Sequence, residues 1–307
     1  MYIFIVNPIA GNGKSKRLFK KIISDKRLNL SNYKVYFTKF EKHAQKMSSE
    51  LIAMKANIDK HWIIIGGDGT LHEVVNGLKG TSVNLSFIPA GSGNDFARGL
   101  NLPTSYDEYI EAIFIKQEKL TYQLGYFQEG YFANCLGVGF DAVVAHATNE
   151  SSLKKRLNQL KIGKLGYTYQ LIKQLLRYKP IDLSITVDDQ KFHFKRCFLF
   201  TINNHPYFGG GMKINPFALN GEDRYHAVLV HNISKWKILF LFVTVFFGKH
   251  TRFHEVAFLQ GRRISVESKK AFLYQVDGET HYAKEFHVFN ERPTIQVIGT
   301  KQDLGGC

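Results

Sequence analysis

The sequence is poor in cysteine and has no long apolar run. Its 307 residues include three cysteines, Cys135, Cys197 and Cys307, which are odd in number and have no CxxC spacing. We therefore expect neither a disulfide framework nor a zinc knuckle, and we predict a reducing, cytoplasmic setting. The longest apolar run, residues 238–247, has ten residues, whereas a membrane-spanning helix needs about 20. The first residues, MYIFIVNPIAGNG, lack the basic start of a signal peptide, so we expect no secretion signal.

Acidic residues are also scarce relative to basic ones. The chain has 41 Lys and Arg against 26 Asp and Glu, which gives a formal net charge of +15. Such an excess indicates a polyanionic partner, and composition alone leaves nucleic acid, a nucleotide and an acidic membrane surface open. Disorder of the whole chain is excluded, because 44% apolar and 14% aromatic residues can build a core. A chain of this length is expected to form two domains.

The first 124 residues alternate short apolar strands with amphipathic segments. This rhythm, with strands apolar on both faces, is typical of a parallel sheet with helices on both faces. We therefore predict an α/β nucleotide-binding domain over residues 1–124, completed by the C-terminal segment 292–307. The predicted strands cover residues 2–6, 33–37, 62–65 and 85–88, and the predicted helices cover residues 16–23, 44–54 and 71–78.

After residue 124 the strand candidates dominate. Many short strands at close spacing predict an antiparallel β-sandwich over residues 125–291, with a hairpin turn at Asp188 and Asp189. Helices are expected over residues 153–178 and 235–247. The predicted strands cover residues 131–134, 183–187, 191–202, 227–232, 263–267, 271–276 and 294–298.

Two glycine-containing loops follow strands early in the first domain. The loop NPIAGNGKS, residues 7–15, nearly matches a phosphate-binding P-loop, but Pro8 stands where the first glycine is required. A P-loop is therefore rejected. Two interpretations stay equally open, an ordinary βα loop and a loop that contacts a phosphate. The loop GGDGT, residues 66–70, precedes a helix for which Thr70 and Glu73 predict a capping box.

The second loop, and a third one, suit a phosphate. Glycines let the backbone approach the anion, and a helix N-terminus donates free N–H groups. Asp68 opposes an anion unless it holds a divalent cation that bridges the phosphates. The third loop, PAGSGND at residues 89–95, offers the Ser92 hydroxyl, with Asn94 or Asp95 as a helix cap. Because ligands of open α/β sheets bind beyond the carboxyl ends of the strands, we expect the three loops to converge there.

Together these motifs resemble a known family. GGDGTLHEVVNGL, with VNPIAG upstream and IPAGSGNDFARGL downstream, resembles the catalytic domain of the diacylglycerol kinase and sphingosine kinase superfamily, most closely soluble bacterial lipid kinases of the diacylglycerol kinase type. ANCLGVGFDAVV, YFGGGMKINPFA, GKH and VDGE continue the resemblance in order along nearly the whole chain. The resemblance implies a nucleotide-binding domain followed by a lipid-binding β-sandwich, ATP and Mg²⁺ as cofactors, and phosphoryl transfer to a lipid hydroxyl.

The resemblance also implies roles for single residues. Glu279 of VDGE would be the general base, because a positioned carboxylate can take the proton of a poorly nucleophilic hydroxyl. Asp68 would be the second catalytic residue, near the metal ion. Without the resemblance, VDGE indicates only a hairpin turn with a surface acid. The implied nucleotide site comprises Asn7, Gly11, Thr38, Gly66, Gly67, Asp68, Gly69, Thr70, Leu71, His72, Glu73, Ser92, Asn94 and Asp95.

One segment departs from the family pattern. These enzymes have Asp-Asp-Gly-Leu or similar after the proline and alanine of a P-x-A motif, and the aspartate helps to hold a structural Mg²⁺. Here Pro216-Phe217-Ala218 is followed by LNGED, so Glu222 falls where the aspartate is expected and Asp223 replaces the glycine. A glutamate can still bind a hard cation, and Glu222 is therefore the expected ligand of this structural metal.

A lipid kinase must also reach its substrate in the bilayer. Residues 151–181 combine apolar residues near helical spacing with eight Lys or Arg and no acid. We expect this segment to contact anionic headgroups, and a core-packed helix with a solvated basic face is the open alternative. The apolar run at residues 238–247, flanked by Lys235, Lys237, Lys249 and Arg252, is the second candidate for membrane contact, and burial in the core is the favoured interpretation. An exposed sheet edge in the second domain would permit a homodimer.

Two other functions compete with the lipid kinase. An NAD kinase-like enzyme shares the GGDGT loop, but IPAGSGND and VDGE favour the lipid kinase. A non-catalytic nucleotide- or lipid-binding protein is disfavoured by the intact Asp68 and Glu279. No RNP, helix-turn-helix or zinc-finger pattern is present, so we expect no nucleic-acid partner.

Overall fold

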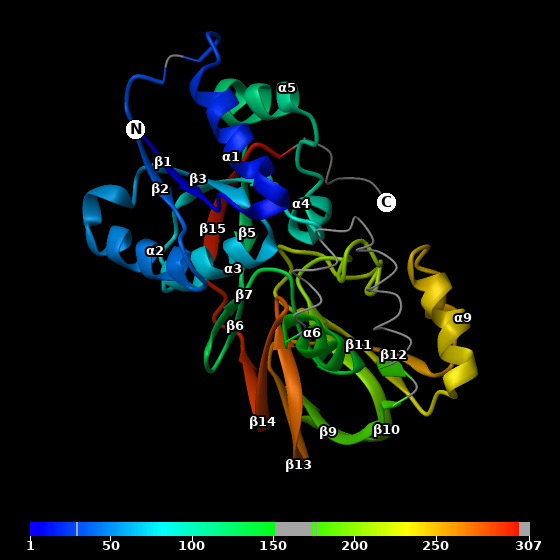
Figure 1. Ribbon diagram of the computed structural model, residues 1–307. Helices are drawn as coiled ribbons and strands as arrows, with labels where there is room; N and C mark the ends of the chain where they lie inside the picture. Colours follow the sequence, from blue (N-terminus) through cyan, green and yellow to red (C-terminus); the bar gives the residue numbers. More distant parts are fainter. Residues whose placement is uncertain (29, 151–173, 176, 301–307) are drawn as a thin grey trace.

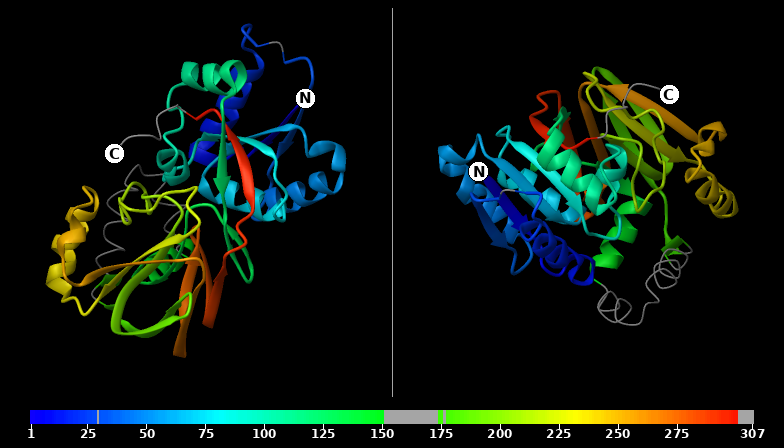
Figure 2. Two further views of the ribbon diagram at one scale, coloured as in Figure 1. Left: turned by 180° about the vertical axis from the view of Figure 1, so that it is seen from behind. Right: turned by 90° about the horizontal axis from the view of Figure 1, so that it is seen from above.

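Two sheets dominate the computed structural model, which describes residues 1–28, 30–150, 174–175 and 177–300 (Figure 1). The first sheet has six strands in the order β2-β1-β3-β4-β15-β5. Its strands are β1 (Tyr2–Val6), β2 (Tyr33–Phe37), β3 (His61–Gly66), β4 (Asn84–Pro89), β5 (Lys119–Gln123) and β15 (Thr294–Ile298). β15 comes from the far end of the chain, lies parallel to β4 and pairs antiparallel with β5. Figure 2 shows β15, in red, beside β5, in green.

Helices cover both faces of this sheet. Alternate residues of one strand point to opposite faces, and β1 follows this rule. Phe4 and Val6 share a core with Phe19 of α1, whereas Ile3 and Ile5 share one with residues of α2 and α3. The prediction of a parallel α/β sheet covered on both sides is confirmed. α1 (Ala10–Ile23), α5 (Tyr106–Tyr109) and the π-helical segment η2 (Ile110–Lys116) lie on one face, and α2 (His43–Ala53), η1 (Lys55–Asn57), α3 (Asp68–Gly77) and α4 (Asp95–Gly99) on the other.

The predicted start of α3 is wrong. The helix begins at Asp68 with Gly67 as its N-cap, and Thr70 lies inside its first turn. The Glu73 carboxylate does not reach back along its own helix. It accepts the backbone N–H groups of Lys42, at 3.0 Å, and Ala44, at 2.9 Å. Glu73 therefore satisfies free donors at the start of α2, and the capping-box pattern marks a contact between two helices.

α2 and α3 approach each other closely at Gly77. A Cβ atom at this position would collide with the backbone carbonyl of Gln45 and lie 2.6 Å from the Cβ of Ser48. Glycine is therefore required for helix packing here. Gly69 in the first turn of the same helix has no atom within 4 Å of an added Cβ.

The second sheet is antiparallel and folds over on itself. Its two longest strands, β10 and β13, each pair with β9 along one half and with β8 along the other. This arrangement encloses an apolar core, and the prediction of an antiparallel β-sandwich is confirmed. The strands are β6 (Gly125–Phe127), β7 (Gly130–Phe132), β8 (Cys135–Gly139), β9 (Ile181–Val187), β10 (Gln190–Asn203), β11 (Tyr225–His231), β12 (Val256–Gly261), β13 (Ile264–Val276) and β14 (Glu279–Phe289).

Several strands of this sheet differ from the sequence prediction. β6, β8, β12 and β14 were not predicted. The two strands expected at 263–267 and 271–276 form one strand, β13, whose register with β14 shifts between Glu267 and Phe272. The turn at Asp188 and Asp189 joins β9 to β10 as predicted.

α6 (Phe140–Glu150) and α9 (Lys235–Val245), with the short η3 (Lys249–Arg252) after α9, pack on the outer face of the second sheet. Burial of the apolar run 238–247 was predicted, and it is only half right. Ile238, Leu241 and Val245 are buried, but the opposite face of α9 is exposed. The helix predicted over residues 153–178 falls almost entirely outside the described residues. Among the residues that are described, no helix is both long and apolar enough to cross a membrane.

Asp141, the second residue of α6, places a carboxyl group in the protein interior. Asp141 is 7% exposed, and its Oδ2 accepts the side-chain amide of Gln275 at 3.2 Å. Its Oδ1 has no hydrogen-bond partner among the described residues. Burial raises the pKa of Asp141 to about 7.

The close approach of α2 and α3 leads to a first prediction. Gly77→Ala is expected to lower the free energy of unfolding by about 1–3 kcal/mol, because the added methyl group overpacks the helix contact. Gly69→Ala, in open space on the same helix, is the matched control and is expected to be neutral or to stabilise by up to about 1 kcal/mol. Urea denaturation of both variants measures the difference. Equal effects would show that the helices can separate at Gly77 without cost.

The buried carboxyl of Asp141 leads to a second prediction. Its folded pKa lies above the unfolded value of 3.8, so the folded state binds the proton more tightly and stability falls as pH rises from about 4 to 7. Asp141→Asn removes this titration. We expect the stability difference between variant and wild type to move in the variant's favour by about 2–3 kcal/mol between pH 5 and pH 8. Denaturation at both pH values measures it, and a constant difference would contradict the assigned burial effect.

Candidate active site

The three glycine-containing loops meet at the carboxyl edge of the first sheet, as predicted. A Cβ at Gly11 would collide with the carbonyl of Ala90, and a Cβ at Gly91 would lie 2.7 Å from the Cα of Gly67. A Cβ at Gly66 would lie 2.7 Å from Oγ1 of Thr70. The loops therefore pack this closely because the glycines have no side chains.

Hydrogen bonds fix the ends of β1 and β2 beside these loops. Asn7 donates its backbone N–H to Ile65 at 3.0 Å, and its Nδ2 donates to Oγ1 of Thr70 at 3.1 Å. At the end of β2, Thr38 donates its backbone N–H to Val6 at 2.9 Å. Asn7, Thr38 and Thr70 thus stand on one edge of the sheet, where the resemblance expected them.

The first loop has an unusual backbone. Gly11, Asn12 and Gly13 follow one another with φ values of 58°, 53° and 81°, in the left-handed region. Ser15 donates its hydroxyl to the carbonyl of Asn7 and thereby closes the loop. α1 was predicted to begin at residue 16, and the left-handed turn explains why its regular part starts only beyond Gly13.

Two carboxylates lie next to each other at the second and third loops. Asp68 accepts the backbone N–H of Asp95 at 3.3 Å and that of Phe96 at 3.2 Å. Burial and then the neighbouring Asp95 charge raise the pKa of Asp68 to about 6. Asp95 is itself buried, which raises its pKa. It pairs with Arg98 and accepts the N–H of Gly210 at 2.7 Å, so it also ties this edge to the second sheet's loops.

The oxygen atoms of Asp68, Asp95 and Asn94 suit a metal ion that arrives bound to a nucleotide. Mg²⁺ in kinases is held by one or two carboxylates together with the phosphates of the substrate. Asp68 and Asp95 supply two such groups, whose repulsion a cation relieves, and the buried Oδ1 of Asn94 has no hydrogen-bond partner among the described residues. No group of three or more His, Cys, Asp or Glu residues that could form an all-protein metal site occurs in the described part of the chain.

Glu222 does not join these groups. Its carboxylate accepts the Nε2 of His226 at 2.7 Å, and its backbone carbonyl accepts a guanidinium N–H of Arg292 at 3.1 Å. Around Glu222 the structure thus places a histidine and an arginine rather than further oxygen ligands on acidic side chains. The adjoining Asn220 is used structurally, since its side chain bonds the backbone N–H and carbonyl of Gln123.

The other residues of the implied nucleotide site divide into two groups. Gly69 and Ser92 are exposed at the loops. Leu71 is fully buried in the core beneath the sheet, and Glu73 bonds the start of α2. His72 is 8% exposed, and its ring is turned toward the second sheet.

His72 connects the two halves of the site. Its Nδ1 lies 2.9 Å from Oδ2 of Asp277, and its Nε2 lies 3.8 Å from Oε2 of Glu279. Burial lowers the pKa of His72, but the hydrogen bond and charge of Asp277 and the charge of Glu279 outweigh it, so the net shift is upward. The His72 ring therefore stands between two carboxylates.

Asp277 is the residue that the sequence reasoning missed, although it belongs to the VDGE motif. Its side chain is fully buried and accepts the backbone N–H groups of Ala133, Asn134 and Cys135 at 2.7, 2.8 and 2.9 Å. Although burial opposes it, the bond from His72 and these N–H donors lower the pKa of Asp277. This carboxylate fixes the turn that presents Glu279, and its φ of 49° is a left-handed conformation adopted at that turn.

α3 sets the spacing between the two halves of the site. Asp68 and His72 are four residues apart in one helix, so they lie on the same face about one turn, or roughly 6 Å, apart. Glu279 is 28% exposed and lies 3.8 Å beyond the His72 ring. Asp68 at the glycine-containing loops and Glu279 of the second sheet are thus linked through α3 and His72.

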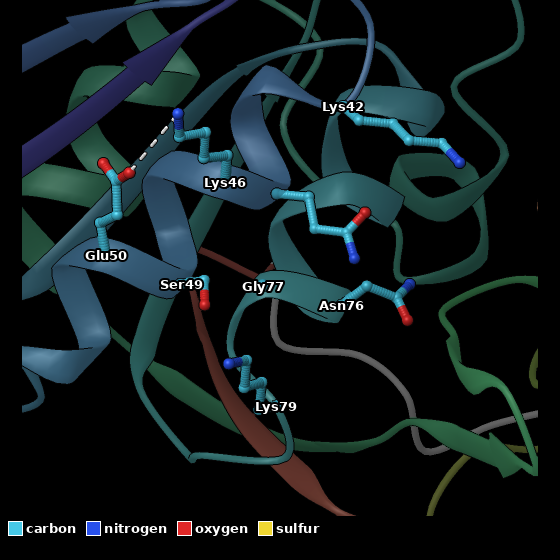
Figure 3. Close-up of a pocket in the computed structure, with 8 residues that line it drawn as sticks. Lys42, Lys46, Ser49, Glu50, Asn76, Gly77 and Lys79 are labelled. Atoms are coloured by element: carbon cyan, nitrogen blue, oxygen red, sulfur yellow. Dashed lines mark ion pairs between the residues drawn. The ribbon is translucent and has the colours of Figure 1, made fainter.

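A separate groove lies between α2 and α3 (Figure 3). It has a volume of about 440 Å³ and contains neither Asp68 nor Glu279. Its Lys46 pairs with Glu50 at 3.9 Å. The lining residues are Lys42, Gln45, Lys46, Ser49, Glu50, Asn76, Gly77 and Lys79. The groove is therefore distinct from the loop edge described above.

Comparison with known proteins follows the same division of the chain. Residues 1–126 match the diacylglycerol kinase catalytic domain, and residues 134–295 match the YegS C-terminal NAD kinase beta sandwich-like domain. A crystal structure of a diacylglycerol kinase from Bacillus anthracis has the same fold, with a TM-score of 0.71, 19% identity, and coverage of 98% of this chain and 97% of the other.

Relatives extend over the full length of the chain. It is 32% identical over 306 residues to "Putative lipid kinase YtlR" of Bacillus subtilis, covering 96% of this chain and 98% of that protein. It is 28% identical over 305 residues to the diacylglycerol kinase of Staphylococcus saprophyticus, covering 98% and 95%. Both domain matches and the full-length relatives agree with the motifs and the two-sheet fold. The chain belongs to the family of diacylglycerol kinase-type lipid kinases, which are phosphotransferases.

Proposed function

We propose that this protein transfers the γ-phosphoryl group of ATP to the hydroxyl of a membrane lipid, diacylglycerol or a related lipid, to give phosphatidic acid or its analogue. The observation that carries the proposal is the His72 bridge: His72 lies one helical turn after Asp68 in α3, and its ring bonds Asp277 and lies 3.8 Å from Glu279. Phosphoryl transfer needs positioning and charge stabilisation more than covalent chemistry from the protein. This arrangement supplies both.

The groups of the site take complementary roles in this reaction. The lipid hydroxyl oxygen forms a bond to the γ-phosphorus while the bond from that phosphorus to the bridging oxygen of ADP breaks. Glu279 accepts the hydroxyl proton, which suits a carboxylate that is 28% exposed and therefore open to substrate. The loops with Gly11, Gly67 and Gly91 bind phosphates through backbone N–H groups. When bound, Mg²⁺ neutralises phosphate charge, and Asp68 and Asp95 are the groups that would hold it.

The setting of the reaction follows from charge. A protein of net charge +15 is drawn to an anionic membrane surface, and its substrate lies in that surface. We therefore place the enzyme in the cytoplasm, in peripheral contact with the inner face of the membrane. The basic segment 151–181, expected from the sequence to make this contact, lies largely outside the described residues.

Transfer of labelled phosphate tests the proposed reaction. With [γ-³²P]ATP, Mg²⁺ and lipids in mixed micelles, we expect a labelled lipid product. Glu279→Gln is expected to lower kcat by about 10²–10⁴-fold, because the isosteric amide cannot accept the proton. An unchanged melting temperature serves as the control for folding. No labelled lipid from the wild type would reject the proposal, and labelled NADP formed from NAD would establish the NAD kinase-like alternative.

The role of His72 gives a further prediction. We propose that it positions Glu279 rather than binding nucleotide, so His72→Gln should lower kcat for the lipid about 10–100-fold and leave KM for ATP unchanged. Asp277→Asn should reproduce this pattern, because it releases the ring of His72. Steady-state kinetics with each substrate varied separates the two roles. A raised KM for ATP with kcat unchanged would instead assign His72 to the nucleotide.

A further inference from the structure

Helix α9 exposes an apolar face that nothing in the described structure covers. It stands at the outer side of the second sheet (Figure 1). The exposed side chains, which we call the α9 face, belong to α9 and the two residues after it. They are Trp236 (78% exposed), Leu239 (43%), Phe240 (72%), Val243 (61%), Phe246 (46%) and Phe247 (71%).

The α9 face is a continuous stripe. Trp236, Phe240, Val243 and Phe247 follow one another at intervals of four, three and four residues, which places them along one side of a helix. The opposite side, with Ile238, Leu241 and Val245, already packs on the second sheet. A helix that is apolar all round is expected inside a large core or in a membrane, and α9 is covered on one side only.

The helix is held firmly in this orientation. Ser234 caps its N-terminus by accepting the N–H of Lys237 at 3.3 Å. The Lys237 ammonium also pairs at 2.7 Å with Glu255, whose side chain is 5% exposed. Because the helix is capped at its N-terminus and is tied to the buried Glu255 carboxylate, the apolar stripe is presented in a fixed orientation.

The residues next to the α9 face in the sequence carry charge of one sign. From residue 234 to residue 254 the sequence contains four Lys or Arg and no acid, and Glu255, which follows, is paired with Lys237. The first turn of α9 contains two lysines and no acidic residue, although a helix N-terminus favours negative charge. Lys249 and Arg252 follow at the other end, in η3. An apolar stripe with cations at both ends complements a surface with an apolar interior and anionic groups at its boundary.

We propose that the α9 face docks on an anionic bilayer, with the helix lying in the headgroup region and its aromatic side chains between the acyl chains. α9 has 11 residues and spans about 16 Å, which suits a helix lying in the plane of the interface and not crossing it. A second copy of the chain is a poorer occupant, because a symmetric pair would bring the same cations face to face.

Docking at this face would orient the site. α9 and α6 share one apolar layer over the second sheet. α6 in turn contacts the turn that carries Glu279, since Asn149 donates its side-chain amide to the carbonyl of Gly278 at 2.9 Å and His146 lies 3.1 Å from Oγ1 of Thr280. The membrane contact and the proposed base are therefore attached to one rigid layer. This inference deepens the proposed function and rests on it for its purpose.

The tryptophans make the test direct. The chain has two, and Trp62 is fully buried while Trp236 is 78% exposed. With vesicles of phosphatidylcholine containing about a third phosphatidylglycerol, we expect a blue shift of the emission and quenching by lipids brominated in the acyl chain. Both signals should vanish in Trp236→Phe. A full-length protein that sediments with vesicles but shows no quenching of Trp236 would overturn the inference.

A matched pair of variants tests the energetics. Phe240→Ser/Phe247→Ser is expected to weaken vesicle binding at least about tenfold. Met54→Ser/Ile115→Ser, at residues 62% and 58% exposed on the first domain, is the control and should bind as the wild type does. Equal binding of both double variants would reject the α9 face. If the wild type is a dimer, Phe240→Ser/Phe247→Ser is a monomer and vesicle binding is unchanged, the α9 face is instead an interface with a second copy of the chain.

The outcomes separate docking from catalysis. If the α9 face docks, Phe240→Ser/Phe247→Ser should lose activity on lipid in vesicles and keep it on a dispersed short-chain diacylglycerol. If the wild type phosphorylates lipid in vesicles and the variant equals it there, the inference fails and the proposed function stands. If the emission of Trp236 in the wild type is quenched by brominated lipids on vesicles but the wild type phosphorylates no lipid in any form, the proposed function fails and the docking surface stands.

Discussion

The contact between His72 and Asp277 joins segments separated by 205 residues and determines how the two sheets can act together. On one side, His72 belongs to the helix that begins at the phosphate-binding loops. On the other, Asp277 binds three backbone N–H groups and fixes the turn with Glu279. Removing one partner of a buried hydrogen bond of this kind costs about 1–3 kcal/mol, because the other group is left unpaired. The position of Glu279 relative to the loops is thus set by a few bonds made deep inside the protein.

Acidic and basic side chains are concentrated in different parts of the molecule. The protein has a net charge of +15, yet Asp68, Asp95, Asp277 and Glu279 concentrate negative charge at the junction of the sheets. A cation would relieve the repulsion among these carboxylates, and under the proposed function the metal-bound nucleotide would supply it. The basic surplus lies elsewhere and leaves the apolar α9 face without competing acids.

Residue patterns predicted much of the fold but only part of the site. Strands at 2–6 and 33–37 were predicted to the residue because short β-branched and aromatic runs favour strands both in the buried β1 and at the sheet edge in β2. β8 was missed because its glycines, required by close approach of Asp141 to Gly137, weaken the strand signal. β14 was missed because charged residues fill its exposed face. The loops of the site are local motifs and were found. The partner of His72 lies in a distant segment, and no local pattern reveals it.

The position of β15 has a consequence for how the chain folds during synthesis. β15 is inserted between β4 and β5, and among the described residues β15 is the only strand that pairs with β5. When the ribosome has released the first 124 residues, β5 has no strand to pair with and one edge of β4 stays open. β5 and the open edge of β4 cannot pair with β15 until residue 298 has emerged, after the entire second sheet has been synthesised. The first sheet, although it begins the chain, is therefore the last to be completed, and a truncated nascent chain has an exposed strand edge of the kind that promotes aggregation.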